Sequence, residues 1–148
     1  SNSYGSPILM DTDCWWLVLN DFCKTAYQKE KITIKSDGSP LRDFIHWSDI
    51  ESAIEFIIDN SKHNVYHMAS GETLSMLELA YKVQDVYYKR YNKQIRIELP
   101  EEVKKTKLKE KEKYTLSIDR LIDIGFEKNN GIDFGINELF DYFENSSK

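Results

Sequence analysis

The sequence predicts a mixed α/β domain, and two alternating patterns indicate it. Short runs rich in apolar and β-branched residues are typical of strands. Between them lie longer segments in which apolar residues recur at every third or fourth position, as on the buried face of a helix. The strand-like runs never form a long meander, which disfavours an all-β fold. At 148 residues the chain is long enough for one domain with its own core.

In the first half of the chain, alternation and helical periodicity define five segments. The helix is expected to start after Asp11 or Asp13, either of which can cap it. Residues 36–40 are of types that tolerate tight backbone geometry, which predicts a turn there. The predicted elements are a strand end with a turn over 1–7, a helix over 14–29, a strand at 32–34, a turn over 36–40 and a strand over 42–47.

Two capping boxes mark helices farther along the chain. Ser48 with Glu51 and Ser75 with Glu78 have the spacing in which the serine and the glutamate each bond the other's backbone amide. The predicted elements here are a helix from residue 48, a strand over 64–68, a helix over 75–90 and a strand over 95–99. The apolar stripe of the first helix includes Ile54 and Ile58.

The last third begins with a charged run over 101–113 that lacks apolar periodicity, so a solvated loop is expected there. Ser117 should cap a short helix that ends at Gly125. Asp133 should cap the final helix, whose inward residues are expected to be Phe134, Leu139, Phe140 and Phe143.

Composition narrows the class of protein. The content of 41% apolar and 30% charged residues is ordinary for a globular domain. A net charge of −5 argues against nucleic acid as the main partner. No apolar run approaches the ~20 residues that cross a bilayer, so no membrane partner is expected. Cys14 and Cys23 are too far apart in one predicted helix for a disulfide, which favours reduced thiols in a cytoplasmic protein.

Several motifs, in the right order, resemble those of one family. Asn2, Tyr4 and Gly5 are similar to the second half of arginine-x-x-asparagine-x-tyrosine-glycine-proline, with the proline one place late at Pro7. A second signature pairs glycine-aspartate-glycine with arginine-aspartate-phenylalanine; it is matched by Asp37, Gly38, Arg42, Asp43 and Phe44, with Ser36 in place of the first glycine. Residues 65–71 and 124–126 resemble two further family segments. The family is the extended short-chain dehydrogenases/reductases, the NAD-dependent epimerases and dehydratases of nucleotide sugars.

This resemblance implies a C-terminal, substrate-binding region spanning 1–148. Its fold would be the last strands of a Rossmann-type sheet plus a small mixed α/β substrate-binding domain. Because the chain starts at Ser1 inside a strand, we expect a fragment, without the N-terminal NAD-binding half and the catalytic tyrosine-x-x-x-lysine. Tyr27 and Lys31 have that spacing, but we interpret them as a chance match at a helix end.

The implied function is nucleotide-sugar binding within an NAD(P)-dependent epimerase or dehydratase that uses hydride chemistry. The cofactor, NAD or NADP, would be held mainly by the missing half, since the glycines of this chain form no dinucleotide fingerprint. The expected partners are the nucleotide sugar, the missing half and, because family members are often dimers, a second copy. Two alternatives remain open: a non-catalytic nucleotide-sugar-binding module, or a reductase of the same family acting on a non-nucleotide substrate.

Five residues are candidates for substrate binding, and none for catalysis. Arg42 offers a planar fork of donors for the pyrophosphate; the alternative is a surface arginine paired with Asp43 or Asp37. Asn2 can bond a sugar hydroxyl or phosphate, or stabilise its turn. One of Trp15 and Trp16 is a candidate for stacking on a nucleobase, with packing in the core as its alternative, and the other is expected to join the core.

Lys109 is a candidate point charge where relatives carry arginine-proline-glycine-aspartate. No metal site is expected, because His46, His63 and His67 do not form a ligand set. His46 and His67 are expected to be buried structural histidines, since both lie on predicted strands beside apolar neighbours.

Overall fold

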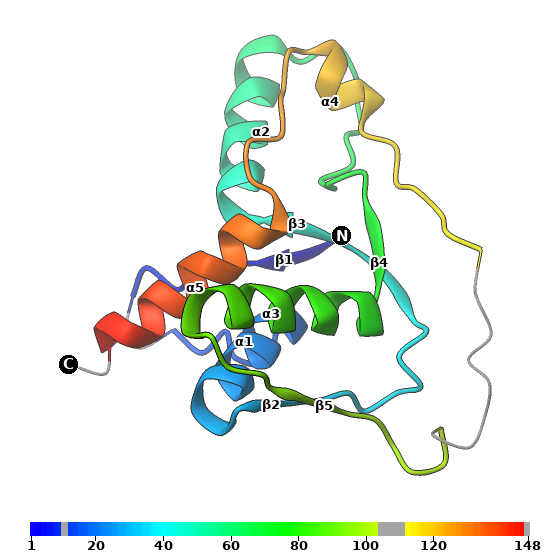
Figure 1. Cartoon of the computed structure of the whole chain (residues 1–148). Coiled ribbons are helices and arrows are strands. Elements are labelled where there is room, and N and C mark those ends of the chain that lie inside the picture. Colours follow the sequence, from blue (N-terminus) through cyan, green and yellow to red (C-terminus); the bar gives the residue numbers. More distant parts are fainter. Residues whose placement is uncertain (10–11, 104–111, 147–148) are drawn as a thin grey trace.

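The computed structural model describes residues 1–9, 12–103 and 112–146. Figure 1 shows a helical layer of α1, α3 and α5 beside a small central sheet, with α2 and α4 at the opposite end. The elements in chain order are β1 (Asn2–Tyr4), α1 (Val18–Lys29), β2 (Lys31–Thr33), β3 (Leu41–His46), α2 (Trp47–Asn60), β4 (Thr73–Ser75), α3 (Met76–Tyr91), β5 (Arg96–Glu98), α4 (Asp119–Asp123) and α5 (Ile132–Ser146).

Two small sheets organise the strands. The central sheet has the order β1-β3-β4, in which β1 runs parallel to β3, and β4 runs antiparallel to it. Asn2 lies opposite Phe44 and Tyr4 lies opposite His46. The second sheet pairs β2 with β5 in parallel, with Ile32 opposite Ile97. The parallel pairs require long crossovers, and these are supplied by the helices.

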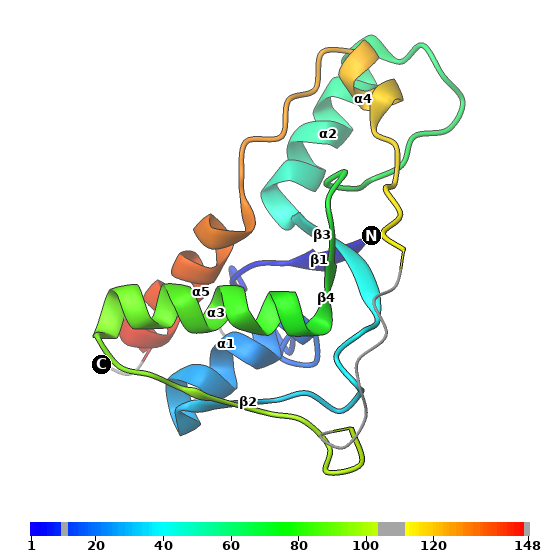
Figure 2. The same ribbon diagram turned by 45° about the vertical axis from the view of Figure 1, so that its right-hand side comes forward.

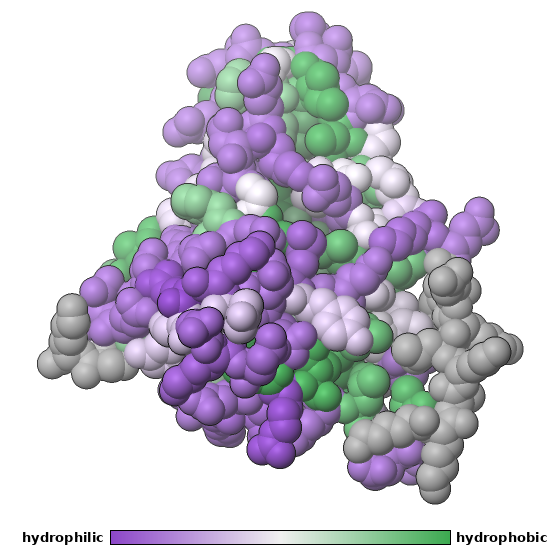
Figure 3. All heavy atoms as spheres, viewed as in Figure 1, coloured by the Kyte–Doolittle hydropathy of each residue, from purple (hydrophilic) through white to green (hydrophobic). Residues whose placement is uncertain are grey.

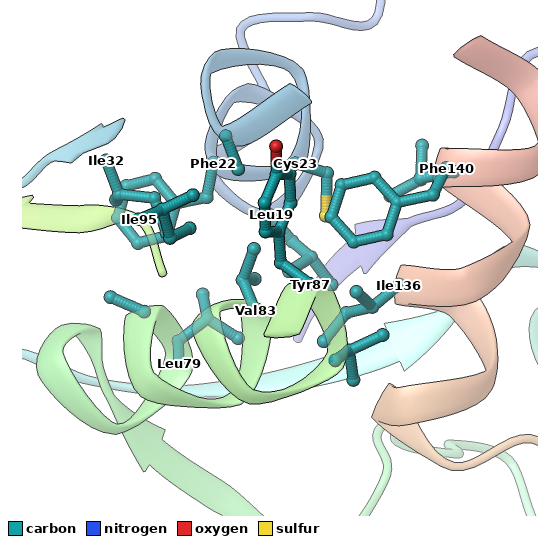
Figure 4. Close-up of a cluster of buried hydrophobic side chains, with 14 of the residues drawn as sticks. Leu19, Phe22, Cys23, Ile32, Leu79, Val83, Tyr87, Ile95, Ile136 and Phe140 are labelled. Carbon is teal, nitrogen blue, oxygen red and sulfur yellow. The ribbon is translucent and has the colours of Figure 1, made fainter. Parts of the chain in front are cut away.

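The main core fills the space between three helices and the β2–β5 pair. Figure 4 shows side chains from α1, α3 and α5 converging, with Ile32 and Ile95 closing one side. The residues with no exposed surface include Cys23, Ala26, Leu79, Val83, Leu139 and Phe140. Burial raises the pKa of the Cys23 thiol, so it behaves as a small apolar side chain. Cys14 and Cys23 are both free.

A second, smaller core joins α2 to α4. It consists of Ala53, Leu121, Ile124 and Phe126, with Phe56 and Ile57 packed against it. Figures 1 and 2 both place this pair of helices away from the α1–α3–α5 layer, with the central sheet between them. The chain therefore has two apolar centres joined through β1 and β3.

The structure confirms most predicted elements and corrects several features. The capping box of Ser75 and Glu78 is present. The predicted strand over 64–68 is wrong: no strand is assigned there, and the amides of Lys62 and His63 bond the Tyr66 hydroxyl instead. The capping box starting at Ser48 is also wrong, because α2 begins earlier, at Trp47, with His46 as its N-cap.

Burial differs from the predicted helix faces at three positions. Phe134 is 53% exposed, and Ile54 and Ile58 of α2 are 45% and 75% exposed. Of the predicted α2 stripe, Ala53 alone is fully buried among the described residues; the elements that α2 contacts are β3 and the short α4. Asp133 lies inside the first turn of α5.

Close approach at one glycine joins α5 to the central sheet. A Cβ atom on Gly135 would lie 2.3 Å from Cε2 of Tyr4 and 3.0 Å from Cδ2 of His46. Both of those side chains are 2% exposed, so neither ring has room to move away. The absence of a side chain at this position lets α5 lie directly on the Tyr4 ring.

We therefore expect Gly135→Ala to lower the free energy of unfolding by about 1–3 kcal/mol, the usual effect of overpacking. The overpacking should outweigh the gain of up to about 1 kcal/mol in helix propensity. Gly131→Ala is the matched control, because a Cβ atom there meets nothing within 4 Å. Urea denaturation of both variants measures the difference; equal stabilities would contradict the contact.

Candidate functional site

The β1–β3 register brings Arg42 and Asn2 to the same face of the central sheet. Asn2 is the partner of Phe44, and Arg42 lies two residues before Phe44 on the same side of the strand. Strand geometry puts their Cα atoms roughly 8 Å apart. Arg42 is exposed and donates to the carbonyl of Leu41 at 2.7 Å, whereas Asn2 donates to the carbonyl of Asp43 at 3.3 Å.

Neither carboxylate proposed as an alternative partner pairs with Arg42 in the part of the chain that the structure describes. Asp43 is buried and accepts bonds from Ser1 and from the amide and hydroxyl of Ser70. Asp37 accepts from Ser39 in its own turn. The guanidinium of Arg42 thus has its remaining donors available to a ligand.

A hollow of about 350 Å³ opens beside the start of α1, which is large enough for part of a small ligand. Its lining comes from α1 and the segment before it, from the segment after β2 and from the start of α3: Trp16, Val18, Asp21, Phe22, Thr33, Ile34, Lys35, Ser36 and Met76. Figure 3 shows apolar side chains gathered at the surface between α3 and the β2–β5 pair. Arg42 is not part of this lining; its register partner Leu74 lies two residues before Met76, which is.

The two tryptophans have different surroundings. The Trp16 ring is 76% exposed, lines the hollow and is held by a bond from its Nε1 to the carbonyl of Asp13. Trp15 packs on Tyr142 and Phe143 of α5, with ring centroids 5.5 Å and 5.2 Å away. Trp16 is therefore the indole with a free face, and Trp15 is the one that contributes to packing.

The turn after β1 is fixed by buried polar groups that the sequence patterns did not reveal. Asn20, which has no exposed surface, bonds both the amide and the carbonyl of Gly5. A Cβ atom on Gly5 would lie 2.0 Å from Cδ1 of Trp47, so only glycine fits there. Burial, with a contribution from Asp49, raises the pKa of the Tyr4 phenol, which suits packing rather than proton transfer.

His46 links this turn to α5 through a chain of hydrogen bonds. Its Nε2 lies 2.6 Å from Oε2 of Glu138, and Ser6 donates to Oε1 of the same carboxylate at 2.7 Å. The other ring nitrogen, Nδ1, lies 2.7 Å from Oγ of Ser48, which accepts a bond from Asn130. These partners assign the tautomer with hydrogen on Nε2. His46 is 2% exposed, as predicted, but His67 is exposed.

Lys109 lies outside the described residues.

A second hollow, of about 400 Å³, lies on the opposite face of the central sheet, where Ser3 and Ile45 line it with Tyr66. The described residues that line it include no indole, arginine or lysine, so it is a weaker candidate for an anionic ligand. No helix within residues 1–9, 12–103 and 112–146 is long and apolar enough to cross a membrane.

Comparison with solved structures gives matches over nearly the whole chain. A UDP-N-acetylglucosamine 4-epimerase from Methanobrevibacter ruminantium M1, in complex with UDP-N-acetylmuramic acid, is 19% identical, with a TM-score of 0.72. A UDP-glucose 4-epimerase from Thermotoga maritima, with UDP-glucose, is 18% identical at 0.70, and RMD from Pseudomonas aeruginosa, with NADPH, is 17% identical at 0.70. These matches cover 98%, 99% and 98% of this chain, and 44%, 45% and 46% of the matched chains.

The chain therefore has the fold of part of an extended short-chain dehydrogenase/reductase. Its structural neighbours include two UDP-sugar 4-epimerases and an NAD-dependent NDP-hexosamine 5,6-dehydratase, TunA, which confirms the resemblance predicted from the sequence at the level of fold. The chain spans less than half the length of each of these structures. No protein-family model and no curated protein sequence matches it.

The His46–Glu138 contact predicts a pH-dependent stability. Burial alone would raise the pKa of Glu138, but bonds from His46 and Ser6 outweigh burial and lower it. Because the folded pKa lies below the unfolded value, about 4.3, the contribution is present above that value. It is lost as the pH falls through the folded pKa.

We expect Glu138→Gln to be less stable than the unmodified protein at pH 7 by about 1.5–3 kcal/mol, as for a hydrogen bond to a charged group. The gap should close as the pH falls below 4. Urea denaturation at several pH values measures it, with the exposed Glu127→Gln as the control. A gap that is constant with pH would contradict the assignment.

Proposed function

We propose that this chain is the substrate-binding portion of an NAD(P)-dependent nucleotide-sugar epimerase or dehydratase. The observation that carries the proposal is an arginine with open donors on β3, beside the strand β4 that leads into the start of α3, where a hollow is lined by an open indole. Arg42 supplies donors suited to a pyrophosphate, and Trp16 presents a flat apolar face for a base. Structural neighbours in complex with UDP-sugars support the same class of ligand.

Asn2 fits this proposal as a contact for the sugar or the phosphate. It shares the sheet face of Arg42, and its amide still has an oxygen free to accept a bond from a hydroxyl group. The turn that follows is fixed by Asn20 and Glu138, so the asparagine is presented by a rigid backbone. Such pre-organisation lowers the cost of ordering groups on binding.

The nicotinamide cofactor is part of the proposal, but the residues of this chain do not fit a dinucleotide cradle. Gly5, Gly38, Gly71 and Gly125 adopt positive φ in four separate turns, and none begins a run of three glycines before a helix. NAD or NADP would therefore be bound by other parts of a longer protein. Among the described residues the chain contributes substrate contacts rather than the hydride-transfer chemistry itself.

Removing the guanidinium of Arg42 tests the phosphate role. In the intact protein that carries this chain, we expect Arg42→Ala to weaken binding of a nucleoside diphosphate sugar by more than tenfold, about 1.4 kcal/mol. Isothermal titration calorimetry measures the affinity. Arg96→Ala is the matched control, because Arg96 is also an exposed strand arginine but lies on β5.

Unchanged affinity in the Arg42 variant would count against the phosphate role. Binding of no nucleotide sugar by the unmodified protein would count against the whole proposal.

A further inference from the structure

The hollow beside α1 contains two charged side chains of opposite sign that have no partner among the described residues. Asp21 and Lys35 both line it. The hydrogen bonds of Asp21 all use its backbone: its amide bonds the carbonyl of Leu17, and its carbonyl accepts from the Thr25 hydroxyl. Its carboxylate has no partner among the described residues. Lys35 follows Ile34 directly and is exposed. A carboxylate and an ammonium in one small hollow, with no ion pair between them, form a complementary acceptor and donor for a ligand.

Nucleobases differ in what they present to such a pair. A carboxylate only accepts hydrogen bonds, and it accepts two in parallel from a planar donor pair. Guanine offers two adjacent donors, N1–H and the 2-amino group, beside the acceptor O6. Uracil and thymine offer one donor between two carbonyl oxygens, and those oxygens would face the carboxylate. Adenine and cytosine each offer one amino donor beside a ring nitrogen that accepts.

We propose that Asp21 selects a guanine nucleotide, accepting bonds from N1–H and the 2-amino group while Lys35 donates to O6 and the Trp16 indole stacks on the ring. This inference rests on the proposed function, because it assigns a base to the nucleotide whose pyrophosphate Arg42 contacts. The indole is already positioned by its bond to the carbonyl of Asp13. The three groups come from the start of α1 and the segment after β2, both of which pack on the main core.

A second explanation for Asp21 is local. It lies in the first turn of α1, where a negative charge stabilises the helix dipole. That role predicts a loss of stability when the charge is removed, but no change in the ranking of nucleotides. The two explanations therefore give different results in one binding experiment.

The test measures affinities of the intact protein for guanosine, inosine, uridine and adenosine diphosphates by calorimetry. We expect the guanosine compound to bind at least tenfold more tightly than the uridine and adenosine compounds. Inosine diphosphate lacks only the 2-amino group and should bind several-fold more weakly than guanosine diphosphate. This comparison needs no variant, so it is independent of any effect of mutation on folding.

Asp21→Asn should then reduce the preference for guanosine over uridine diphosphate by at least tenfold, because an amide offers one acceptor and one donor in place of two acceptors. Asp59→Asn, at an exposed position of α2, is the matched control and should leave the preference unchanged. Arg42→Ala should weaken all four compounds alike.

The remaining outcomes would overturn either the role of Asp21 alone or the proposed function with it. Equal affinities for all bases, or a preference for uridine diphosphate, would overturn the role of Asp21 and leave the proposed function standing. The same holds for a guanosine preference that survives Asp21→Asn. Failure of every nucleoside diphosphate and nucleoside diphosphate sugar to bind would overturn the proposed function and this inference together.

Discussion

The parallel pairing of β1 with β3 is the constraint on which the site depends. It sets Asn2 beside Phe44 and Tyr4 beside His46, and so places Asn2 and Arg42 on one face. A shift by one residue would turn every side chain of β1 to the opposite face. The register is fixed at both ends. Ser1 bonds Asp43 at one end, and at the other the Tyr4 ring lies 5.3 Å from the His46 ring.

Several buried polar groups lie around this pairing, and they are nearly all satisfied. Asn20, Asp43 and His46 are each at most 2% exposed, and each bonds a backbone group or a side chain from a distant part of the chain. Such groups are costly when unpaired and specify one arrangement when paired. Here they tie the turn after β1 to α1, α2 and α5 at once. The turn that follows Asn2 is thereby held in place by groups that lie outside the candidate site.

Local signals predicted the elements that depend on local bonds. Ser75 and Glu78 are three residues apart and bond each other's backbone amides, so their box could be found from spacing alone. The cap of α2 could not, because His46 is an uncommon cap and its orientation depends on Glu138, 92 residues away. The segment over 64–68 has strand-like residues, but strand formation requires a neighbouring edge, and no described strand pairs with it.

In the candidate site, too, the sequence predicted some features, and others depend on the fold. Motif order identified Arg42 and Asn2, but their shared face follows from a register that only the fold reveals. Trp15 and Trp16 are adjacent in sequence, and the sequence left open which of them is packed. Tyr142 and Phe143, at the other end of the chain, pack on Trp15, so Trp15 is the packed indole. Asp21 and Lys35 carried no motif, and they matter only because the hollow brings them together.

An overall charge of −5 does not conflict with an anionic ligand, because the field at a site is set by nearby groups. Charges farther away than a Debye length, about 8 Å at physiological salt, are largely screened when exposed. Within the described residues, several acidic side chains are neutralised locally: Glu30, Glu98 and Asp141 each contact a cation. Among the described residues, Lys35 and one carboxylate, Asp21, line the hollow beside α1, and Arg42 has open donors on β3. Under the proposed function, that local pattern would attract a phosphate and still offer an acceptor to a base, which a uniformly basic surface would not.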